Sequence, residues 1–528
     1  MYSVILSKFF LRLHNCVSMT IEAIATPIRI HPDNPKLFEF RGKPLVLLTA
    51  TEHYGAVINR PFRFERYLAD TAEKQITMTR LFMLFREQQS SINPYSTCKP
   101  ETPDYIAPFL RTGPGRALDL ELKYDLDKPN PEFFRRLHDF ISQASTHGII
   151  VEVVLLSNTY APGVWDLNPL NAKNNVNGLD EIAWPDYLSQ RHAKLFARQV
   201  AHVRKIVTEL NAYDNVIFEI CNEPGGAAPG GAAPGMENPP SLDEVNDWLA
   251  ALIQVVRETE AALPNRHLIA GQQAFQYTPW EQNSDLTFLH MDYDVVNMHP
   301  LPNTTFGGQG YHLGDFMSKQ LRLRAVRDFG LATYATPKPL NQDEDNVASQ
   351  YKDVDGWTIH RKRAWMTLLT GGHYDYIDFS INNYLETGTP ASQRHIRIWM
   401  KYLSEFVHSL DLVQARPLPN VVKAQPAHIV ETVFGVPGDD YAICLADERE
   451  LAAARGLDDG DAIDRGAGQT IEGELVLDLP AGTYQMSCFS PATGLYSPAL
   501  QLQGGPNTRV GLPAFTHDLA VRIQRWQA

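Results

Sequence analysis

Two carboxylates follow predicted buried strands, and they are the side chains of this sequence best placed to do chemistry. In NVIFEICNEPGG, Asn215–Gly226, a run of β-branched and aromatic residues ends abruptly at Asn222 and Glu223. In KPLNQDEDN, residues 338–346, Glu344 leaves a short run about one strand in length. An exposed acidic turn would also explain each carboxylate, so a function requires that both meet at one site.

A pair of strand-end carboxyls has a specific chemical use. Two carboxyl groups about 5 to 5.5 Å apart support retaining glycoside hydrolysis, in which one is the nucleophile and the other the general acid and then base. Because adjacent side chains of a strand point to opposite faces, we expect only one of Asp343 and Glu344 to point into such a site. Asn222 is placed to hydrogen-bond a sugar 2-hydroxyl, a contact that strengthens in the transition state.

The elements that must position these residues are read from hydrophobic periodicity. Short apolar runs alternate with helical patterns over residues 45–410, which predicts βα units and a parallel sheet. The expected strands are PLVLLTA, ITMTRLFML, GIIVEVVLL, NVIFEI, HLIAG, DVVNMH, KPLNQ and YDYIDFS. Eight strands favour a closed (β/α)8 TIM barrel of the α/β class, preceded by a small hairpin. In such a barrel the carboxyl ends of the strands face the active-site mouth.

Helix-capping residues support this alternation. Asn130 is a suitable N-cap, Pro131 suits the first helical position, and Gly148 suits a left-handed stop. Ser241 and Glu244 have the spacing of a capping box ahead of a further helix.

The sequence changes character near residue 412. GELVLDLPAGTYQMSCFSPATGLYS alternates with period two, and it places Tyr484, Met486 and Cys488 on one face between Pro/Gly turns. We therefore expect a small C-terminal β-sandwich over residues 412–528.

The remaining chain divides accordingly. Residues 28–411 are the expected barrel, and residues 1–27 are expected to be a disordered or misassigned start. The segment GGAAPGGAAPGMENPP, residues 225–240, is predicted to be a flexible insertion, with a substrate lid as the alternative.

Composition limits the partners. The formal charge of −14 disfavours nucleic acid and anionic membrane surfaces and suits a neutral ligand. The five cysteines show no metal-binding spacing and predict neither a disulfide framework nor a zinc site. Lys8 and Arg12 interrupt the apolar N-terminal run, so a cytoplasmic location is favoured over a secreted or periplasmic one. No apolar run approaches the roughly 20 residues of a transmembrane helix.

These motifs together resemble the cellulase-like retaining glycosidases, a large clan of (β/α)8-barrel enzymes. FEICNEP is similar to their acid/base signature, in which Asn-Glu-Pro follows the fourth strand, and KPLNQDED is similar to the seventh strand, which leads to the nucleophilic Glu. GKPLVLLTATEHYG, AWMTLLTGGHYDYIDFS and DLPAGTYQMSCFSPATG are similar to bacterial members that carry a C-terminal β-domain. The resemblance implies double displacement on an oligo- or polysaccharide, with no metal or organic cofactor.

The resemblance also implies roles for particular residues. Glu223 would be the acid/base and Glu344 the nucleophile, with Asp343 as a rival nucleophile. Arg80, at the end of the second strand, would support the nucleophile, or it is an ordinary ion-pair former. His299, at the end of the sixth strand, would line the sugar site, or it is a core histidine.

Further pocket residues are expected beside these. Glu52, His53 and Tyr54 follow the first strand and are either pocket lining or a structural turn. Tyr160 and Trp165 follow the third strand and are either sugar-stacking platforms or packing residues. The eighth strand ends in DFSINNY without the Trp that cellulases often place under the sugar, so glucan specificity is not implied.

Two other functions remain open at this stage. A barrel that binds carbohydrate without turning it over would keep the same fold. A transglycosylase would use the same pair of carboxyls and pass the sugar to an acceptor other than water.

Overall fold

The computed structural model describes most of the chain. The described residues are 26–87, 96–227, 238–277, 280–299, 303–313, 322–345, 354–449 and 466–526. The expected disordered start lies almost wholly outside these ranges, as does most of the Gly/Ala/Pro segment over residues 225–240.

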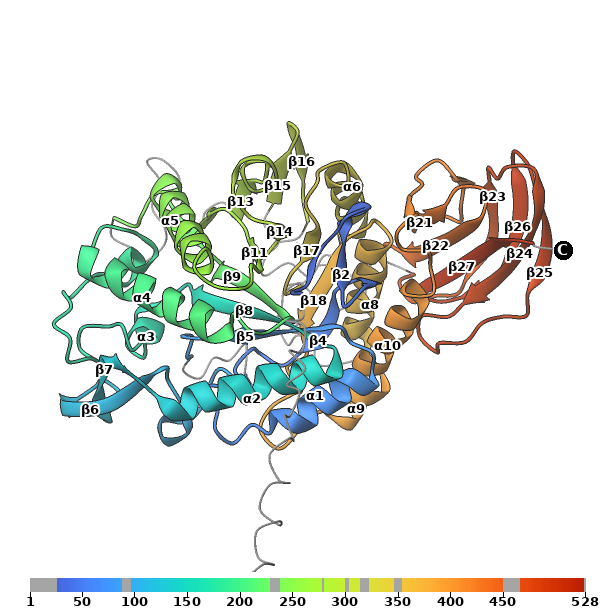
Figure 1. The fold of residues 1–528 in the computed structure, drawn as a ribbon. Coiled ribbons are helices and arrows are strands. Elements are labelled where there is room, and N and C mark those ends of the chain that lie inside the picture. Colours follow the sequence, from blue (N-terminus) through green and yellow to red (C-terminus); the bar gives the residue numbers. More distant parts are fainter. Residues whose placement is uncertain are drawn as a thin grey trace, which may run out of the picture.

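A barrel of eight parallel strands forms the centre of the molecule (Figure 1). Its strands are β4 (Leu48–Thr51), β5 (Met78–Phe82), β8 (Ile150–Ser157), β9 (Val216–Asn222), β11 (Leu268–Gly271), β14 (Val295–Asn297), β17 (Leu340–Gln342) and β18 (His373–Ile377). Hydrogen bonds join them in the order β4-β18-β17-β14-β11-β9-β8-β5. The Thr77 amide donates to the Leu48 carbonyl at 3.0 Å and brings β5 against β4, so the barrel is nearly closed. The predicted (β/α)8 architecture is confirmed.

Helices surround the barrel, and most of them are amphipathic, whereas the described residues of the helix Val354–Leu368, from Trp357 on, are buried throughout. They are α1 (Phe64–Glu73), α2 (Pro131–His147), α4 (Ala193–Leu210), α5 (Leu242–Glu260), α6 (Leu323–Thr333), α8 (Val354–Leu368) and α10 (Ile396–Val407), with short α3 (Pro162–Trp165) and α9 (Pro390–Arg394). The predicted caps are present. The Asn130 side chain accepts from the Glu132 amide at 3.1 Å, Gly148 has a φ of 74°, and Ser241 and Glu244 form a complete capping box.

The two ends of the barrel differ in character. At the amino end, the sheet of β1 (Arg29–His31), β2 (Asn34–Phe40) and β3 (Lys43–Leu45) is the predicted hairpin region. Phe38 and Phe40 of β2 share a core with Met78, Ile150 and Ile217, which lie at or next to the start of three barrel strands, and they form an apolar floor.

Insertions after the barrel strands build up the carboxyl end. A hairpin of β6 (Phe109–Arg116) and β7 (Leu122–Pro129) follows β5. A five-stranded sheet is formed by β10 (Gly225–Gly226), β12 (Phe275–Tyr277), β13 (Trp280–Asn283), β15 (Asn303–Phe306) and β16 (Gln309–Tyr311). These strands come from the loops after β9, β11 and β14, so they rise on the side of the barrel where the site is expected.

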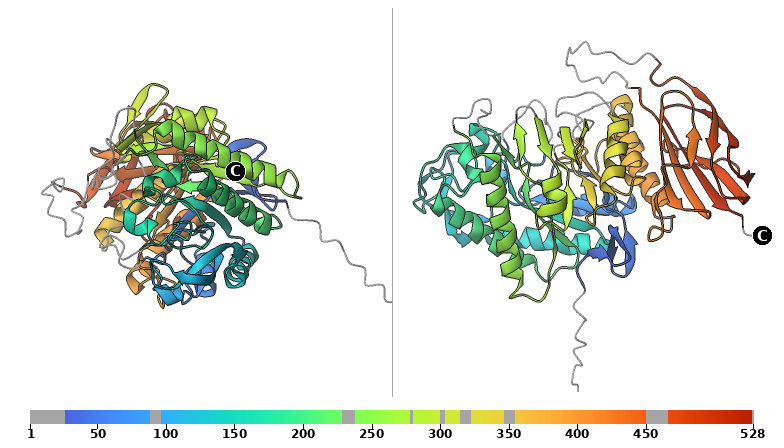
Figure 2. Two further views of the ribbon diagram at one scale, coloured as in Figure 1. Left: turned by 90° about the vertical axis from the view of Figure 1, so that its left-hand side faces the viewer. Right: turned by 90° about the horizontal axis from the view of Figure 1, so that it is seen from above.

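Two antiparallel sheets form the C-terminal part, which lies beside the barrel in Figure 1 and in the right-hand view of Figure 2. One contains β19 (Arg416–Pro417), β21 (Ile429–Val436), β22 (Asp440–Asp447), β24 (Gly482–Phe489), β25 (Leu500–Gly504) and β27 (Asp518–Arg525). The other contains β20 (Val422–Ala424), β23 (Ile471–Leu477) and β26 (Thr508–Phe515). Tyr484, Met486 and Cys488 face the core between the sheets, as the alternation predicted.

The six-stranded sheet packs on the barrel through α8 and α10. Trp365 and Phe406 of these helices share a core with Phe434 and Phe489 of the sheet. A buried ion pair crosses the same boundary, since Arg361 Nε donates to an oxygen of Asp518 at 2.8 Å. The C-terminal sheets therefore brace the outer wall of the barrel, away from the carboxyl ends of its strands.

Among the described residues, no helix combines the length and apolar character needed to cross a lipid bilayer.

Candidate active site

The guanidinium of Arg80 lies at the centre of the candidate site. Arg80 belongs to β5 and is fully buried. Its Nη1 donates to Glu344 Oε2 at 3.1 Å, its Nη2 donates to Asn222 Oδ1 at 2.9 Å, and its Nε donates to Glu219 Oε2 at 2.9 Å. The ring of Tyr54 lies 4.5 Å from the guanidinium carbon and covers one face of it. Arg80 on β5 thus connects residues from three other segments of the barrel.

Glu223 is the first residue after β9, and Glu344 is the second residue after β17. Both have left-handed backbones, with φ of 49° and 48°. Such a conformation costs of order 1–3 kcal/mol in a residue other than glycine and persists where the surroundings enforce it. At Glu223 the surroundings include Asn158, whose Nδ2 donates to the Glu223 carbonyl at 2.9 Å. These turns direct both carboxyls toward the mouth.

His299 joins the two carboxyls. Its Nε2 lies 3.2 Å from Glu223 Oε1 and 3.2 Å from Glu344 Oε2. Two oxygens at that distance from one atom are no more than about 6.4 Å apart, which suits retaining rather than inverting geometry. The two carboxylates predicted from separate motifs therefore meet at one site.

Hydrogen bonding assigns a proton within this group. Asn222 Oδ1 accepts from Arg80, so His299 Nδ1, at 3.0 Å from the same oxygen, must carry a proton and donate it. Burial, reinforced by Arg80, lowers the pKa of His299 well below its ordinary value, so the ring is neutral and Nε2 is an acceptor. One of the two carboxyls facing Nε2 must then hold a proton.

Glu223 is the better holder of that proton. Burial raises the pKa of Glu223 to about 7. Burial raises the pKa of Glu344 well above its ordinary value, although the charge and hydrogen bond of Arg80 oppose that shift, so the hydrogen bonds rather than the pKa shifts must place the proton. Because Glu344 accepts from Arg80 Nη1, we place the negative charge on Glu344 and the proton on Glu223.

Three residues expected from the sequence lie around the two carboxyls, namely Asn222, Tyr160 and His53. Asn222 Nδ2 donates to the Tyr160 hydroxyl at 2.6 Å, which orients the amide. His53 is buried, and its ring centroid lies 5.5 Å from that of Phe379. Burial lowers the pKa of His53 to about 3, so it is a neutral wall of the site. Glu52 instead accepts the Gly55 amide at 2.8 Å and serves the turn after β4.

Trp165 is placed differently from these residues. It is buried in α3 with its ring 5.5 Å from that of Tyr187, within the core outside the barrel. This is the packing alternative that the sequence left open, and the indole does not form an exposed platform.

The expectation that only one of Asp343 and Glu344 points inward is wrong. Asp343 Oδ2 lies 3.2 Å from Arg80 Nη2, and Glu344 Oε2 lies 3.1 Å from Nη1. The rule of alternation fails because β17 ends at Gln342 and Glu344 takes a left-handed backbone. Asp343 is fully buried below the mouth, whereas Glu344 keeps some exposure.

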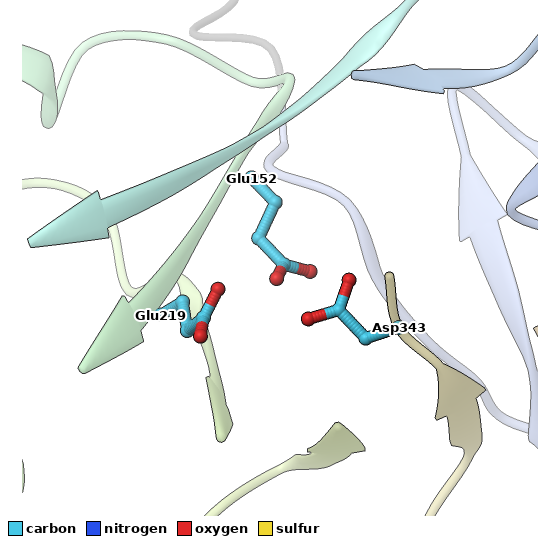
Figure 3. A group of neighbouring side chains, drawn as sticks. All are labelled: Glu152, Glu219 and Asp343. Atoms are coloured by element: carbon cyan, nitrogen blue, oxygen red, sulfur yellow. The ribbon is translucent and has the colours of Figure 1, made fainter. Parts of the chain in front are cut away.

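Sequence reasoning missed a group of carboxyls inside the barrel. Figure 3 shows Glu152, Glu219 and Asp343 converging from three strands or strand ends. Their oxygens lie within 4.8 Å of one another, an arrangement that suits a cation. Arg80 lies 3.5, 2.5 and 3.2 Å from them, so its guanidinium is the cation that these residues surround. A signal existed, since VEVV and FEI each place one Glu in an otherwise apolar strand.

Comparison with known proteins places the site in a family context. Residues 109–362 match the family described as Cellulase (glycosyl hydrolase family 5), a range that includes both Glu223 and Glu344. No curated protein matches the sequence.

Solved structures match the fold over nearly the whole chain. A glycoside hydrolase family 5 protein from Bacteroides vulgatus has a TM-score of 0.58 at 12% identity, covering 94% of this chain and 92% of its own. A second structure from that organism, called a putative glycoside hydrolase, has a TM-score of 0.58 at 13% identity, covering 95% and 82%. At these identities the likeness shows the arrangement of barrel and C-terminal sheets.

The raised pKa of Glu223 predicts how stability varies with pH. Between its ordinary value of 4.5 and about 7, folded Glu223 keeps a proton that the unfolded chain has released. The free energy of unfolding should therefore fall as the pH rises through this window, because the folded state binds more protons. Denaturant unfolding at several pH values should show a shallower fall for Glu223→Gln. Exposed Glu258→Gln is the control, and an unchanged slope in Glu223→Gln would contradict the assignment.

Proposed function

We propose that this chain, a cellulase-like (β/α)8 glycosidase, cleaves O-glycosidic bonds of an oligo- or polysaccharide by double displacement with retention. In this proposal Glu223 is the acid/base and Glu344 is the nucleophile. The observation that carries it is the placement of His299 Nε2 at 3.2 Å from both carboxyls, with Arg80 bound to only one side of the pair through Glu344.

The first step uses the proton assigned above. Glu223 protonates the glycosidic oxygen as the bond breaks, and Glu344 attacks the anomeric carbon to form a glycosyl ester. Arg80 keeps Glu344 ionised and in position before the attack. Loss of the Glu344 charge in the ester then lowers the pKa of Glu223, since a nearby negative charge has gone.

The second step reverses the role of Glu223. As a carboxylate it removes a proton from water, which attacks the glycosyl ester and releases Glu344. Asn222, fixed by Arg80 and the Tyr160 hydroxyl, presents its amide beside the dyad and is the proposed partner of the sugar 2-hydroxyl. His299 contacts both carboxyls, whereas Tyr54 is fully buried and supports Arg80 from one face.

The charge pattern supports a neutral carbohydrate as substrate. The carboxyls around the site outnumber Arg80, and the whole chain carries a formal charge of −14. An anionic sugar would meet repulsion from both. A binding protein without turnover has no use for a protonated Glu223 beside an ionised Glu344, so the geometry favours an enzyme.

The acid role of Glu223 predicts a dependence on the leaving group. Glu223→Gln should lower kcat/KM on natural glycosides by about 10²–10⁴-fold. On aryl glycosides with acidic leaving groups the loss should be far smaller, because departure there needs little protonation. We expect this difference in steady-state kinetics on the two substrate classes, with Glu258→Gln as the exposed control. Equal losses on both classes would exclude Glu223 as the acid.

The nucleophile role of Glu344 predicts chemical rescue. Glu344→Gly should be inactive on natural glycosides, because both displacement steps need this carboxylate. Azide should restore turnover of an activated aryl glycoside and give a glycosyl azide of inverted configuration, identified by NMR. Asp343→Asn, the matched neighbouring change, should retain measurable activity without azide. Rescue of an inactive Asp343 variant, with Glu344→Gly still active, would reverse the assignment.

A further inference from the structure

The buried carboxyls of Asp343 and Asp375 form a pair beneath the site that the proposed reaction does not use. In the parallel register of β17 and β18, Gln342 lies beside Tyr374, so Asp343 lies beside Asp375 one residue further on. Both side chains are fully buried and within hydrogen-bonding contact of each other. Asp343 also lies 3.2 Å from Arg80 Nη2, and Asp375 accepts from the Tyr54 hydroxyl at 3.1 Å.

The pair lacks enough hydrogen-bond donors for two carboxylates. Both oxygens of Asp343 and Oδ1 of Asp375 are buried without a hydrogen-bond partner in the described part of the chain. Two ionised carboxylates in contact repel each other and cannot bond, because neither carries hydrogen. A single proton between them removes the repulsion and satisfies one of these oxygens. The second negative charge remains and faces Arg80.

The surroundings favour retention of this proton. The groups that face the pair are Tyr54 after β4, Arg80 on β5, Glu152 on β8, Glu219 on β9 and Glu344 after β17. The strand residues of β11 and β14 include no titratable side chain. Among these groups Arg80 carries a positive charge and faces several carboxyls. Burial raises the pKa of Asp375 to about 7 and that of Asp343 well above its ordinary range, which favours retention of a proton near neutral pH.

We propose that Asp343 and Asp375 share one proton and together act as a positioning pair for Arg80, which leaves the Nη1 side of the guanidinium free to hold Glu344 ionised. This inference rests on the proposed function only for the role of Glu344. With one proton the pair contributes one negative charge beside Arg80 rather than two. The smaller charge limits the repulsion of Glu344 and keeps the nucleophile ionised at lower pH.

The proposal predicts an unusual pattern in the acid limb of the pH dependence of kcat/KM. That limb reports ionisation of Glu344 in the free enzyme. Asp343→Asn and Asp375→Asn each replace a proton-sharing pair by one amide and one carboxylate, so the charge stays at minus one and the limb stays in place. The double variant removes that charge, and its limb should move to lower pH by about one unit or more. The position of the limb is the readout, whatever happens to the maximal rate.

The other protonation states give different patterns. If both carboxyls were ionised, each single variant would itself shift the limb to lower pH. If both were protonated, none of the three variants would shift it. Exposed Asp180→Asn is the control and should match the unchanged protein. Either alternative pattern overturns the proposal.

A second measurement does not depend on catalysis. Infrared difference spectra between the unchanged protein and each variant, taken near neutral pH, report the carbonyl band of protonated carboxyls. Each single variant should lose the intensity of one protonated carboxyl. The double variant should lose the same intensity and no more. No loss in the single variants, or twice the loss in the double, would overturn the shared proton. Absence of glycosidase activity with the expected infrared pattern would instead refute the proposed function alone.

Discussion

The charge of one buried guanidinium organises the interior of this barrel. Arg80 lies within 3.5 Å of Glu152, Glu219, Asp343 and Glu344, which extend from three other strands or their ends. An uncompensated charge in such an interior is costly, and breaking a buried pair typically costs about 3–5 kcal/mol. The strands must therefore keep the register that brings these side chains to Arg80. Stability and catalysis depend on the same contacts.

The rest of the fold makes this polar interior tolerable. Phe38 and Phe40 close the amino end of the barrel with an apolar floor, and Tyr54 covers one face of the guanidinium. Helices α8 and α10 seal the outer wall, where the C-terminal sheets pack. Water is thus excluded from below and from the side, and the carboxyl ends of the strands remain as the approach to Glu223 and Glu344. The low exposure of that site raises the pKa of Glu223 into the range where it can donate a proton.

Periodicity and capping residues were sufficient to predict the architecture. All eight barrel strands overlap the runs expected from the sequence, although β4, β8, β9 and β18 extend slightly beyond them, and the caps at Asn130 and Ser241 are formed. Glu223 and Glu344 could be identified because each lies just beyond the end of an apolar run, Glu223 one residue after β9 and Glu344 two residues after β17. The position of Asp343 could not, because alternation holds only within the strand and the left-handed backbone of Glu344 lies beyond its end. The acid group inside the barrel depends on contacts between distant strands, which local patterns do not reveal. Even so, a lone Glu in an apolar strand indicates a buried partner.

The most direct test of this account is to trap the glycosyl ester that double displacement requires. A 2-deoxy-2-fluoro glycoside with an activated leaving group slows both steps but lets the ester accumulate. Proteolysis and mass spectrometry of the inactivated protein should find the sugar on Glu344. Attachment to Asp343, or inactivation without any covalent sugar, would contradict the assignment of Glu344 as the nucleophile held by Arg80.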